Sequence, residues 1–159
     1  SRMLLEYARA AEADGKLTWD LYIVNAGLHD IRIEPETGVR QVSDAEYRQN
    51  LSMLFELLLR QGARVIFVNT TNADEAVHNA RIQKFWRFSR DVAAVNQIAG
   101  EVCRTYGVEL IDLYTFTLGF GKEGYTDHIH YTPEISEKQA AYIAEKVRGF
   151  VKHRPLTGR

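Results

Sequence analysis

Residues 19–30 read Trp-Asp-Leu-Tyr-Ile-Val-Asn-Ala-Gly-Leu-His-Asp, and this stretch decides the fold. Its first part, Trp19–Asn25, is short and nearly continuously apolar, which is typical of a strand buried on both faces of a parallel sheet. Its second part, Asn25–Asp30, is more polar and contains a glycine, so we expect the strand to end there in a loop. In a parallel sheet the loops that follow the strands gather at one edge, where ligands bind. The stretch therefore predicts a sheet strand and one side of a functional site.

Two further apolar runs continue this plan. Arg64–Val68 is predicted as a second buried strand and Val108–Leu113 as a third. Apolar residues at helical spacing lie before, between and after the strands, and they predict helices over residues 3–13, 43–60, 90–106 and from 133 onward. This alternation implies right-handed crossovers, and therefore an α/β fold with a parallel sheet and helices on both faces. Three strands are few for such a sheet, so we expect one or two more from residues that precede Ser1.

Local signals mark the ends of several helices. Ser43 and Glu46 form a capping box, in which Ser43 accepts a hydrogen bond from the amide of Glu46 and Glu46 reaches back. Gly107 suits the carboxyl end of the helix before the third strand. Thr132 as N-cap and Pro133 at the first helical position predict the start of the last helix.

Three segments lack such periodicity. Residues 31–42 mix proline, glycine and charges and are predicted as a surface excursion, and residues 116–125, with three glycines, as a loop. The segment 73–88 is left open between a lid over the site and the entry to a helix. Residues 1–152 are expected to form a single domain, and residues 153–159 a frayed tail.

Composition excludes several classes of protein. The chain has 159 residues, 45% of them hydrophobic, and a net charge of −1, so it lacks the basic excess that a nucleic-acid partner would favour. No apolar run approaches the length of a membrane-spanning helix. The one cysteine, Cys103, excludes an intrachain disulfide and a cysteine-based zinc site, and we expect it to be a buried structural thiol. No signal peptide is visible, but the chain opens on Ser1-Arg2-Met3, so the compartment stays open, export after removal of a leader included.

The strongest candidate for catalytic chemistry is the pair Asp127 and His130, in the segment Tyr125–Glu134. A carboxylate three residues before an imidazole, in one short loop, can fix the tautomer and angle of that imidazole as a general base. The alternative is an ordinary turn with a capping aspartate and a histidine that hydrogen-bonds locally. Position favours catalysis, because the pair lies between the last strand and the last helix, at the edge where ligands bind.

His128 offers another interpretation of the same loop. In an extended segment His128 and His130 share a face, so with Asp127 they could form a two-histidine metal site. No third ligand of clear spacing follows in the sequence, so neither a metal nor any other cofactor is predicted.

Gly27–Asp30 is the second candidate. A glycine at the end of a strand lets the backbone approach a ligand closely or adopt a positive φ. The Gly27 amide, with a side-chain donor from His29 or Asn25, could stabilise a developing oxyanion. The alternative is a strand-to-loop turn that Asp30 merely caps, and the spacing alone does not choose between them.

Together these blocks resemble the SGNH (GDSL-like) hydrolase family. Gly27-Leu28-His29-Asp30 after an apolar strand is similar to the family's Gly-x-Asn-Asp block, and Asp127-His128-Ile129-His130 is similar to its terminal Asp-x-x-His block. The Gly-Leu-His-Asp motif and the His-aromatic-Thr-Pro-Glu motif that begins at His130 are most similar to those of a subgroup of bacterial SGNH-like proteins. The resemblance covers essentially the whole chain, as the carboxyl-terminal part of a family domain.

The resemblance implies a flavodoxin-like three-layer α/β/α sandwich and a serine esterase or acylhydrolase. His130 would be the general base and Asp127 the acid that orients it, while Gly27 and His29 would occupy the oxyanion block. Further oxyanion or substrate contacts would come from Asn25 and Thr70. The substrate would be a small-molecule or carbohydrate ester with a small acyl group such as acetyl.

Two departures from the family pattern matter. His29 stands where the family has asparagine, so a neutral imidazole would replace an amide as the donor. The Gly-Asp-Ser block with the nucleophile is absent, and the serines present suit structural roles, with Ser43 as a helix cap and Ser52, Ser89 and Ser136 within helical segments. We therefore expect the nucleophilic serine upstream of Ser1. If there is none, a non-catalytic carbohydrate- or protein-binding module of the same fold is the alternative.

Overall fold

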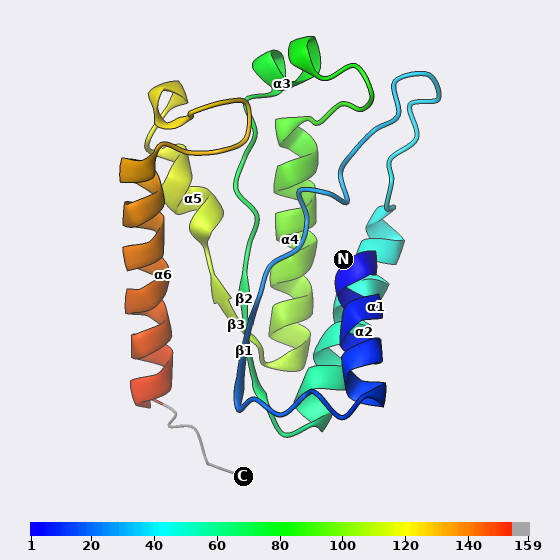
Figure 1. Cartoon of the computed structure of the whole chain (residues 1–159), viewed down its shortest axis with the longest axis vertical. Coiled ribbons are helices and arrows are strands. Elements are labelled where there is room, and N and C mark those ends of the chain that lie inside the picture. The colour runs from blue at the N-terminus through cyan, green and yellow to red at the C-terminus, as the bar shows by residue number, and fades with distance from the viewer. Residues whose placement is uncertain (154–159) are drawn as a thin grey trace.

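The computed structural model describes residues 1–153 (Figure 1). At its centre is a three-stranded parallel sheet in the order β1-β2-β3, formed by Leu21–Val24, Arg64–Val68 and Glu109–Ile111. Ile23 pairs with Ile66, and Ile66 with Glu109, so β2 is the central strand. Helices connect the successive strands, as parallel pairing requires.

The helices cover both faces of the sheet. On one face lies α6 (Pro133–His153), and on the other lie α2 (Asp44–Arg60) and α4 (Ser89–Tyr106), with α1 (Arg2–Ala13) packed against α2 (Figure 1). The short elements α3 (Glu75–Arg81), α5 (Leu113–Leu118) and the 3-10 turn η1 (Lys122–Gly124) follow β2 and β3. The predicted α/β fold with a parallel sheet between helical layers is confirmed.

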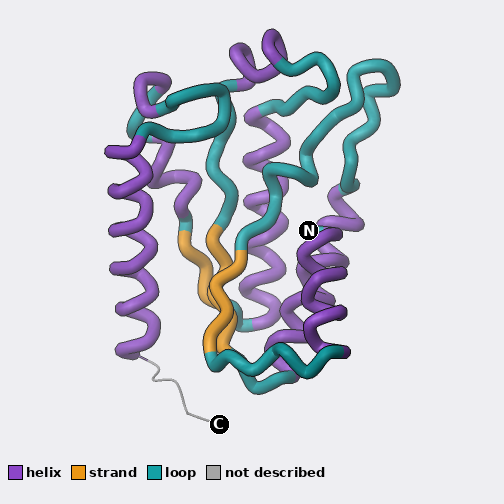
Figure 2. Tube along the Cα trace, viewed as in Figure 1, coloured by secondary structure: helices purple, strands orange, loops and turns teal. Residues whose placement is uncertain are grey.

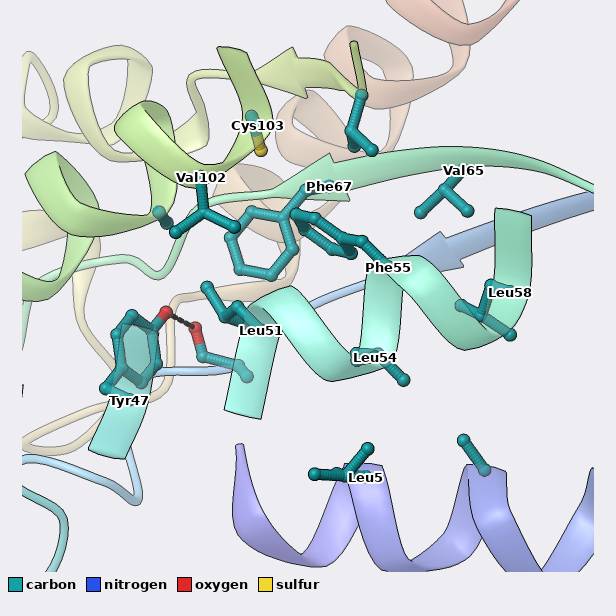
Figure 3. Packing of buried hydrophobic residues seen from close by; sticks show 14 of the residues in the cluster. Leu5, Tyr47, Leu51, Leu54, Phe55, Leu58, Val65, Phe67, Val102 and Cys103 are labelled. Atoms are coloured by element: carbon teal, nitrogen blue, oxygen red, sulfur yellow. Dashed lines mark hydrogen bonds between the residues drawn. The ribbon is translucent and has the colours of Figure 1, made fainter. Parts of the chain in front are cut away.

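The central strand β2 supplies side chains to two cores, because successive residues of a strand point to opposite faces. Val65 and Phe67 pack with α1, α2 and α4, whereas Ile66 and Val68 pack with α6. Phe55 of α2 meets Phe67 edge to face, with ring centroids 5.8 Å apart (Figure 3). These four of the five residues of β2 are at most 5% exposed, so they are buried on both faces of the sheet as the sequence predicts.

The first strand, β1, is shorter and more exposed than its sequence predicts. It covers four residues rather than the expected Trp19–Asn25, and Ile23 is 48% exposed. The physical reason is its position at the edge of the sheet. β2 pairs with one side of β1, and within residues 1–153 no strand pairs with the other. An apolar side chain on an edge strand lacks the cover that a second neighbour would provide.

Other boundaries also differ from the prediction. β3 is shorter than Val108–Leu113, since Asp112 leaves the strand and caps α5 by accepting from the amide of Thr115. Residues 116–125, predicted as a loop, contain the end of α5 and the turn η1. The open segment 73–88 contains α3, whose N-cap Asp74 accepts from the amide three residues on.

The predicted helix caps are present with one exception. Ser43 accepts from the amide of Glu46 at 3.2 Å, and Gly107 ends α4 in the left-handed conformation with φ 64°. Thr132 accepts from the amide of Ile135 at 3.4 Å. The carboxylate of Glu46 does not complete the capping box, because Arg2 of α1 holds both of its oxygens.

The carboxyl ends of all three strands lie at the same end of the sheet. The loops that follow the strands gather there beside α3 (Figures 1 and 2). Cys103 is buried as predicted, and burial raises the pKa of its thiol to about 12. No helix within residues 1–153 is long and apolar enough to cross a membrane. Of the predicted tail, His153 is the last residue of α6, and residues 154–159 lie outside the described part.

Candidate active site

The loop of residues 125–131, termed the dyad loop, holds Asp127 and His130 together. Nδ1 of His130 lies 2.7 Å from Oδ2 of Asp127, and the amides of Ile129 and His130 donate to Oδ1 at 2.7 and 2.8 Å. The hydrogen bond from the His130 ring and the two backbone hydrogen bonds hold the pKa of Asp127 far below its usual range. The carboxylate is therefore charged at ordinary pH and is fixed by three donors.

This geometry determines the tautomer of His130. Because an ionised carboxylate can only accept, the neutral ring of His130 carries its proton on Nδ1 and its lone pair on Nε2. The His130 side chain is 73% exposed, and Asp127 is its only side-chain partner within residues 1–153. An oriented, accessible imidazole with a free Nε2 is the arrangement that a general base needs.

Two tyrosines close the base of the dyad loop. The rings of Tyr125 and Tyr131 stack with centroids 4.5 Å apart, and their hydroxyl oxygens are 3.1 Å apart. The hydroxyl of Tyr125 also donates to the carbonyl of Asn72, in the segment after β2, at 3.1 Å. Inside the loop, the amide of Thr126 donates to the carbonyl of His130 at 2.8 Å. Hydrogen bonds thus hold the dyad loop together and attach it to the segment that follows β2.

Gly27 shapes the second loop, residues 25–30, termed the glycine loop. Its φ is +143°, and a Cβ at this position would lie 2.8 Å from Cγ2 of Thr70. Thr70 is itself fixed by Asn96 of α4, whose side chain donates to the Thr70 carbonyl at 2.8 Å and accepts from its amide at 3.0 Å. Both the backbone conformation and the available space therefore require glycine here.

Several amides of the glycine loop have no acceptor in the described part of the chain. The two amides that follow His29 donate to the carbonyl of Gly27, whereas those of Gly27, Leu28 and His29 have no acceptor within residues 1–153. Nε of Arg87 donates to the carbonyl of Leu28 at 2.8 Å. The carbonyl of Leu28 and the N–H of His29 belong to one planar trans peptide group, in which they point in opposite directions. The N–H of His29 therefore points away from Arg87. Successive free amides of this kind can stabilise a developing oxyanion.

His29 is exposed at the surface of the glycine loop, and its surroundings favour the neutral ring. Partial burial lowers the pKa of His29, and the positive charges of Arg32 and Arg87 lower it further. A neutral imidazole keeps one N–H donor and one acceptor nitrogen. The neutral ring can therefore still supply the one hydrogen-bond donor that the role predicted for His29 needs.

The structure gives Asn25 and Thr70 supporting contacts. Nδ2 of Asn25 donates to the carbonyl of Val68 at 2.7 Å and so joins the end of β1 to the end of β2. Thr70 is 3% exposed, and its methyl group packs against Gly27. Both residues support the glycine loop, and a direct contact of either with a substrate stays a prediction.

His128 contacts His78 and does not form the two-histidine metal site with His130 that its position in the sequence suggested. Its Nδ1 lies 2.9 Å from Nδ1 of His78 in α3, and the two rings meet edge to face with centroids 4.7 Å apart. In the described residues, no group of three histidine, cysteine, aspartate or glutamate side chains is arranged to hold a metal ion. The metal interpretation of Asp127, His128 and His130 therefore loses its geometric basis.

Ser1 does not offer a nucleophile to the dyad. Its hydroxyl donates to Oδ1 of Asp30 at 2.7 Å and lies 3.0 Å from Nδ2 of Asn50, so it serves to anchor the buried Asp30. Among residues 1–153, no serine side chain hydrogen-bonds to His130.

Four further residues support the site. Sequence reasoning missed Tyr47, His78 and Arg87, and it left Asn96 open between packing its amide toward the site and facing solvent. Tyr47 of α2 donates from its hydroxyl to the carbonyl of Ala26 at 2.9 Å, in the glycine loop (Figure 3). All four are buried polar side chains on helices or connections distant in sequence from the loops that they contact. A polar residue within an apolar helical stripe was the available signal for Tyr47 and Asn96, whereas nothing local pointed to His78 or Arg87.

A sequence model of the GDSL-like Lipase/Acylhydrolase family matches residues 1–138. The chain belongs to this family. The matched region of the GDSL-like chain contains both the glycine loop and the dyad loop, and the family is one of carboxylic ester hydrolases. No curated protein sequence matches the chain.

Solved structures of the same fold also match the chain. The lipase/acylhydrolase from Enterococcus faecalis superposes with a TM-score of 0.69 at 19% identity, over 96% of this chain and 71% of that protein. An acetyl xylan esterase gives a TM-score of 0.69 at 14% identity, over 90% and 75%. A member of the lipolytic protein G-D-S-L family from Veillonella parvula gives 0.62 at 15%, over 89% and 73%. At these identities the likeness shows the fold, and it confirms the α/β arrangement with helices on both faces of the parallel sheet.

Proposed function

We propose that this GDSL-like chain is part of an ester hydrolase that removes small acyl groups, such as acetyl, from small-molecule or carbohydrate esters by a Ser-His-Asp mechanism. The observation that carries the proposal is the 2.7 Å hydrogen bond that orients Nδ1 of His130 on Asp127 and leaves Nε2 free at an exposed site. The ester-hydrolase chemistry of the family supports the reaction class.

In this mechanism His130 acts first as a base and then as an acid. Its Nε2 takes the proton of a serine hydroxyl as the serine oxygen attacks the ester carbonyl, and it returns that proton to the departing alcohol. Water then gives a proton to the same nitrogen as its oxygen attacks the acyl-serine carbonyl. The imidazolium returns that proton to the serine oxygen as the carboxylic acid leaves. Asp127 holds the imidazole in the required tautomer and stabilises the imidazolium that forms.

The glycine loop supplies the oxyanion donors. The amides of Gly27, Leu28 and His29 have no acceptor within residues 1–153, and the carbonyl groups of Ala26 and Leu28 are held by Tyr47 and Arg87. Donors that are already oriented need no reorganisation when charge develops on the ester oxygen. The neutral ring of His29 adds a donor that takes the place of the family's asparagine amide.

The nucleophilic serine is proposed to lie in residues that precede Ser1, on a strand beside β1. Two observations support this position. The outer edge of β1 has no partner strand within residues 1–153 and exposes Ile23. The chain also spans 71% of the Enterococcus faecalis protein and 75% of the acetyl xylan esterase, so these proteins have residues without a counterpart here. A serine at the carboxyl end of a strand beside β1 would share the sheet edge with His130.

Hydrolysis of p-nitrophenyl acetate tests the proposal, with a protein that includes the residues upstream of Ser1. His130→Ala is expected to lower kcat/KM by about 10³-fold or more. A chelator is expected to have no effect, and His153→Ala, at the end of α6, serves as the histidine control that leaves the rate unchanged.

Three outcomes would contradict this mechanism. Full activity of His130→Ala would remove the dyad from the reaction. Loss of activity in chelator would favour a metal-dependent hydrolase. Inactivity of every form toward a panel of small esters would favour the non-catalytic binding module.

A further inference from the structure

The connection between β2 and α4 touches both loops of the proposed site. Residues 74–88, termed the bridging segment, carry α3 and lie at the edge where the strands end (Figure 1). At the start of the segment the amide of Asp74 donates to the carbonyl of His128 in the dyad loop at 3.0 Å. Near its end Nε of Arg87 donates to the carbonyl of Leu28 in the glycine loop at 2.8 Å. One segment thus contacts the two loops that are separated by about a hundred residues in the chain.

His78 makes the side-chain contact with the dyad loop. It is fully buried on α3, and its Nδ1 lies 2.9 Å from Nδ1 of His128. Burial lowers the pKa of His78 to about 4, and the charges of Arg87 and His128 act in the same direction. The ring is therefore neutral at neutral pH, so one imidazole of the pair donates and the other accepts. Since His128 lies two residues before His130, this hydrogen bond restrains the backbone that carries the base.

Arg87 makes the contact with the glycine loop. It is 2% exposed, and no carboxylate within residues 1–153 pairs with its guanidinium, which lies 5.0 Å from the ring centre of Phe85. Arg32 lies over the same ring at 4.3 Å, and burial together with the charge of Arg32 lowers the pKa of Arg87 to about 10. A buried cation without a counter-ion is unfavourable for stability, and an apolar side chain would fill this space at lower cost. The hydrogen bond to Leu28 is the contact that an apolar side chain could not make.

Asn79 joins the two contacts into one unit. It follows His78 on α3, and its side chain donates to the carbonyl of Arg87 and accepts from the amide of Arg87, both at 2.9 Å. Phe85 adds an apolar link, because its ring packs against His78 with centroids 5.5 Å apart. A shift of His78 is therefore transmitted to Arg87, and through Arg87 to the glycine loop.

We propose that the bridging segment sets the separation between the dyad loop and the glycine loop, with His78 and Arg87 as positioning residues that act through His128 and Leu28. Its catalytic consequence rests on the proposed ester hydrolysis, while its structural part does not. Nε2 of His130 and the oxyanion donors must act on the same carbonyl group, and a displacement of about 1 Å can lower a rate by about 10²-fold.

Paired substitutions separate the hydrogen bonds from the packing. His78→Asn keeps a hydrogen-bonding group near the position of Nδ1, whereas His78→Leu removes it. Likewise Arg87→Lys keeps a donor, and Arg87→Met keeps only the apolar stem. Arg64→Met is the matched control, because Arg64 is a half-buried arginine at the amino end of β2, away from the two loops. There it contacts Glu109 and the carbonyl of Phe150.

Amide hydrogen exchange measures the structural effect of these substitutions in this chain. The informative amides are those of Ile129 and His130, which donate to Asp127. His78→Leu is expected to speed their exchange at least about tenfold, and His78→Asn to stay within about threefold of wild type. In the protein with upstream residues, His78→Leu and Arg87→Met are expected to lower kcat at least about tenfold with little change in KM, and His78→Asn and Arg87→Lys to recover most of it.

Unchanged exchange in His78→Leu, or the same local change in Arg64→Met, would overturn the positioning role. An active wild-type enzyme whose kcat is unaffected by both His78→Leu and Arg87→Met would overturn it as well. If the exchange rates respond as expected but the wild-type protein hydrolyses no ester, the proposed function fails and the structural coupling stands.

Discussion

Gly27 lies against Thr70 so closely that a Cβ added to it would be 2.8 Å from Cγ2 and 3.2 Å from Cβ of Thr70. The φ of +143° is also unfavourable for any residue with a side chain. Gly27→Ala is therefore expected to destabilise the protein by about 2–4 kcal/mol, from backbone strain and overlap together. The midpoint of urea unfolding measures this loss.

A second substitution divides that loss into its two causes. Thr70→Ser deletes the methyl group that makes the 2.8 Å contact and keeps the hydroxyl. The double variant Gly27→Ala/Thr70→Ser is expected to regain about 1 kcal/mol relative to the sum of the single effects. Strict additivity of the two substitutions would show that the contact with Thr70 does not determine the choice of glycine.

Tyr47 controls the residue just before Gly27. Its buried hydroxyl donates to the carbonyl of Ala26, so Tyr47→Phe leaves that carbonyl unpaired in a buried position. We expect a loss of about 1–2 kcal/mol in the free energy of unfolding and a lower kcat. Tyr7→Phe is the control, since Tyr7 is 72% exposed on α1, and it should change neither quantity. Equal effects of the two substitutions would contradict the role given to Tyr47.

His78 makes stability depend on pH. Its folded-state pKa is about 4, below the ordinary value of 6.5, so the unfolded chain binds a proton more readily. The contribution of His78 is fully present above about pH 6.5 and is lost as the pH falls toward about 4, with a total of ~1–3 kcal/mol. Unfolding at a series of pH values across this window measures the slope. His78→Asn, which does not titrate, should flatten it, and an unchanged slope would assign the pH dependence to other groups.

Asp127 is predicted to matter through the tautomer that it selects. Asp127→Asn leaves an oxygen for the amides of Ile129 and His130, but its NH₂ group faces Nδ1 of His130. Nδ1 must then accept, the proton moves to Nε2, and the base is lost. We expect kcat/KM to fall by about 10³- to 10⁴-fold while the fold is retained. Nitrogen-15 NMR of the imidazole reports the tautomer without any substrate, and a proton that stays on Nδ1 would contradict this account.

The parts of the site that depend on local sequence were predictable. Asp127 and His130 are three residues apart in one loop, and their hydrogen bond needs no help from the rest of the chain. The start of α6 at Thr132 and Pro133 and the cap at Ser43 depend likewise on neighbouring residues alone. The α/β order followed from apolar runs whose meaning does not change with tertiary packing.

The contacts that fix the two loops could not be predicted from local sequence patterns. His78 meets His128 across 50 residues of sequence, and Arg87 meets Leu28 across 59. Each of these contacts depends on the position that α3 and its connection to α4 take in the folded protein. The burial of β1 was overestimated for a similar reason, because an apolar strand sequence does not show whether a second neighbour covers its edge. The end of β3 was missed because Asp112 could equally continue a strand or cap a helix.

The central claim is that Asp127 and His130 serve a serine supplied by residues that precede Ser1. A fluorophosphonate probe, which bonds covalently to activated serines, tests it most directly when the labelled protein is mapped by mass spectrometry. We predict one adduct per chain, on a serine upstream of Ser1, that is lost in His130→Ala and retained in His153→Ala. An adduct that forms equally well in His130→Ala, or no adduct at all in the protein with its upstream residues, would contradict the account.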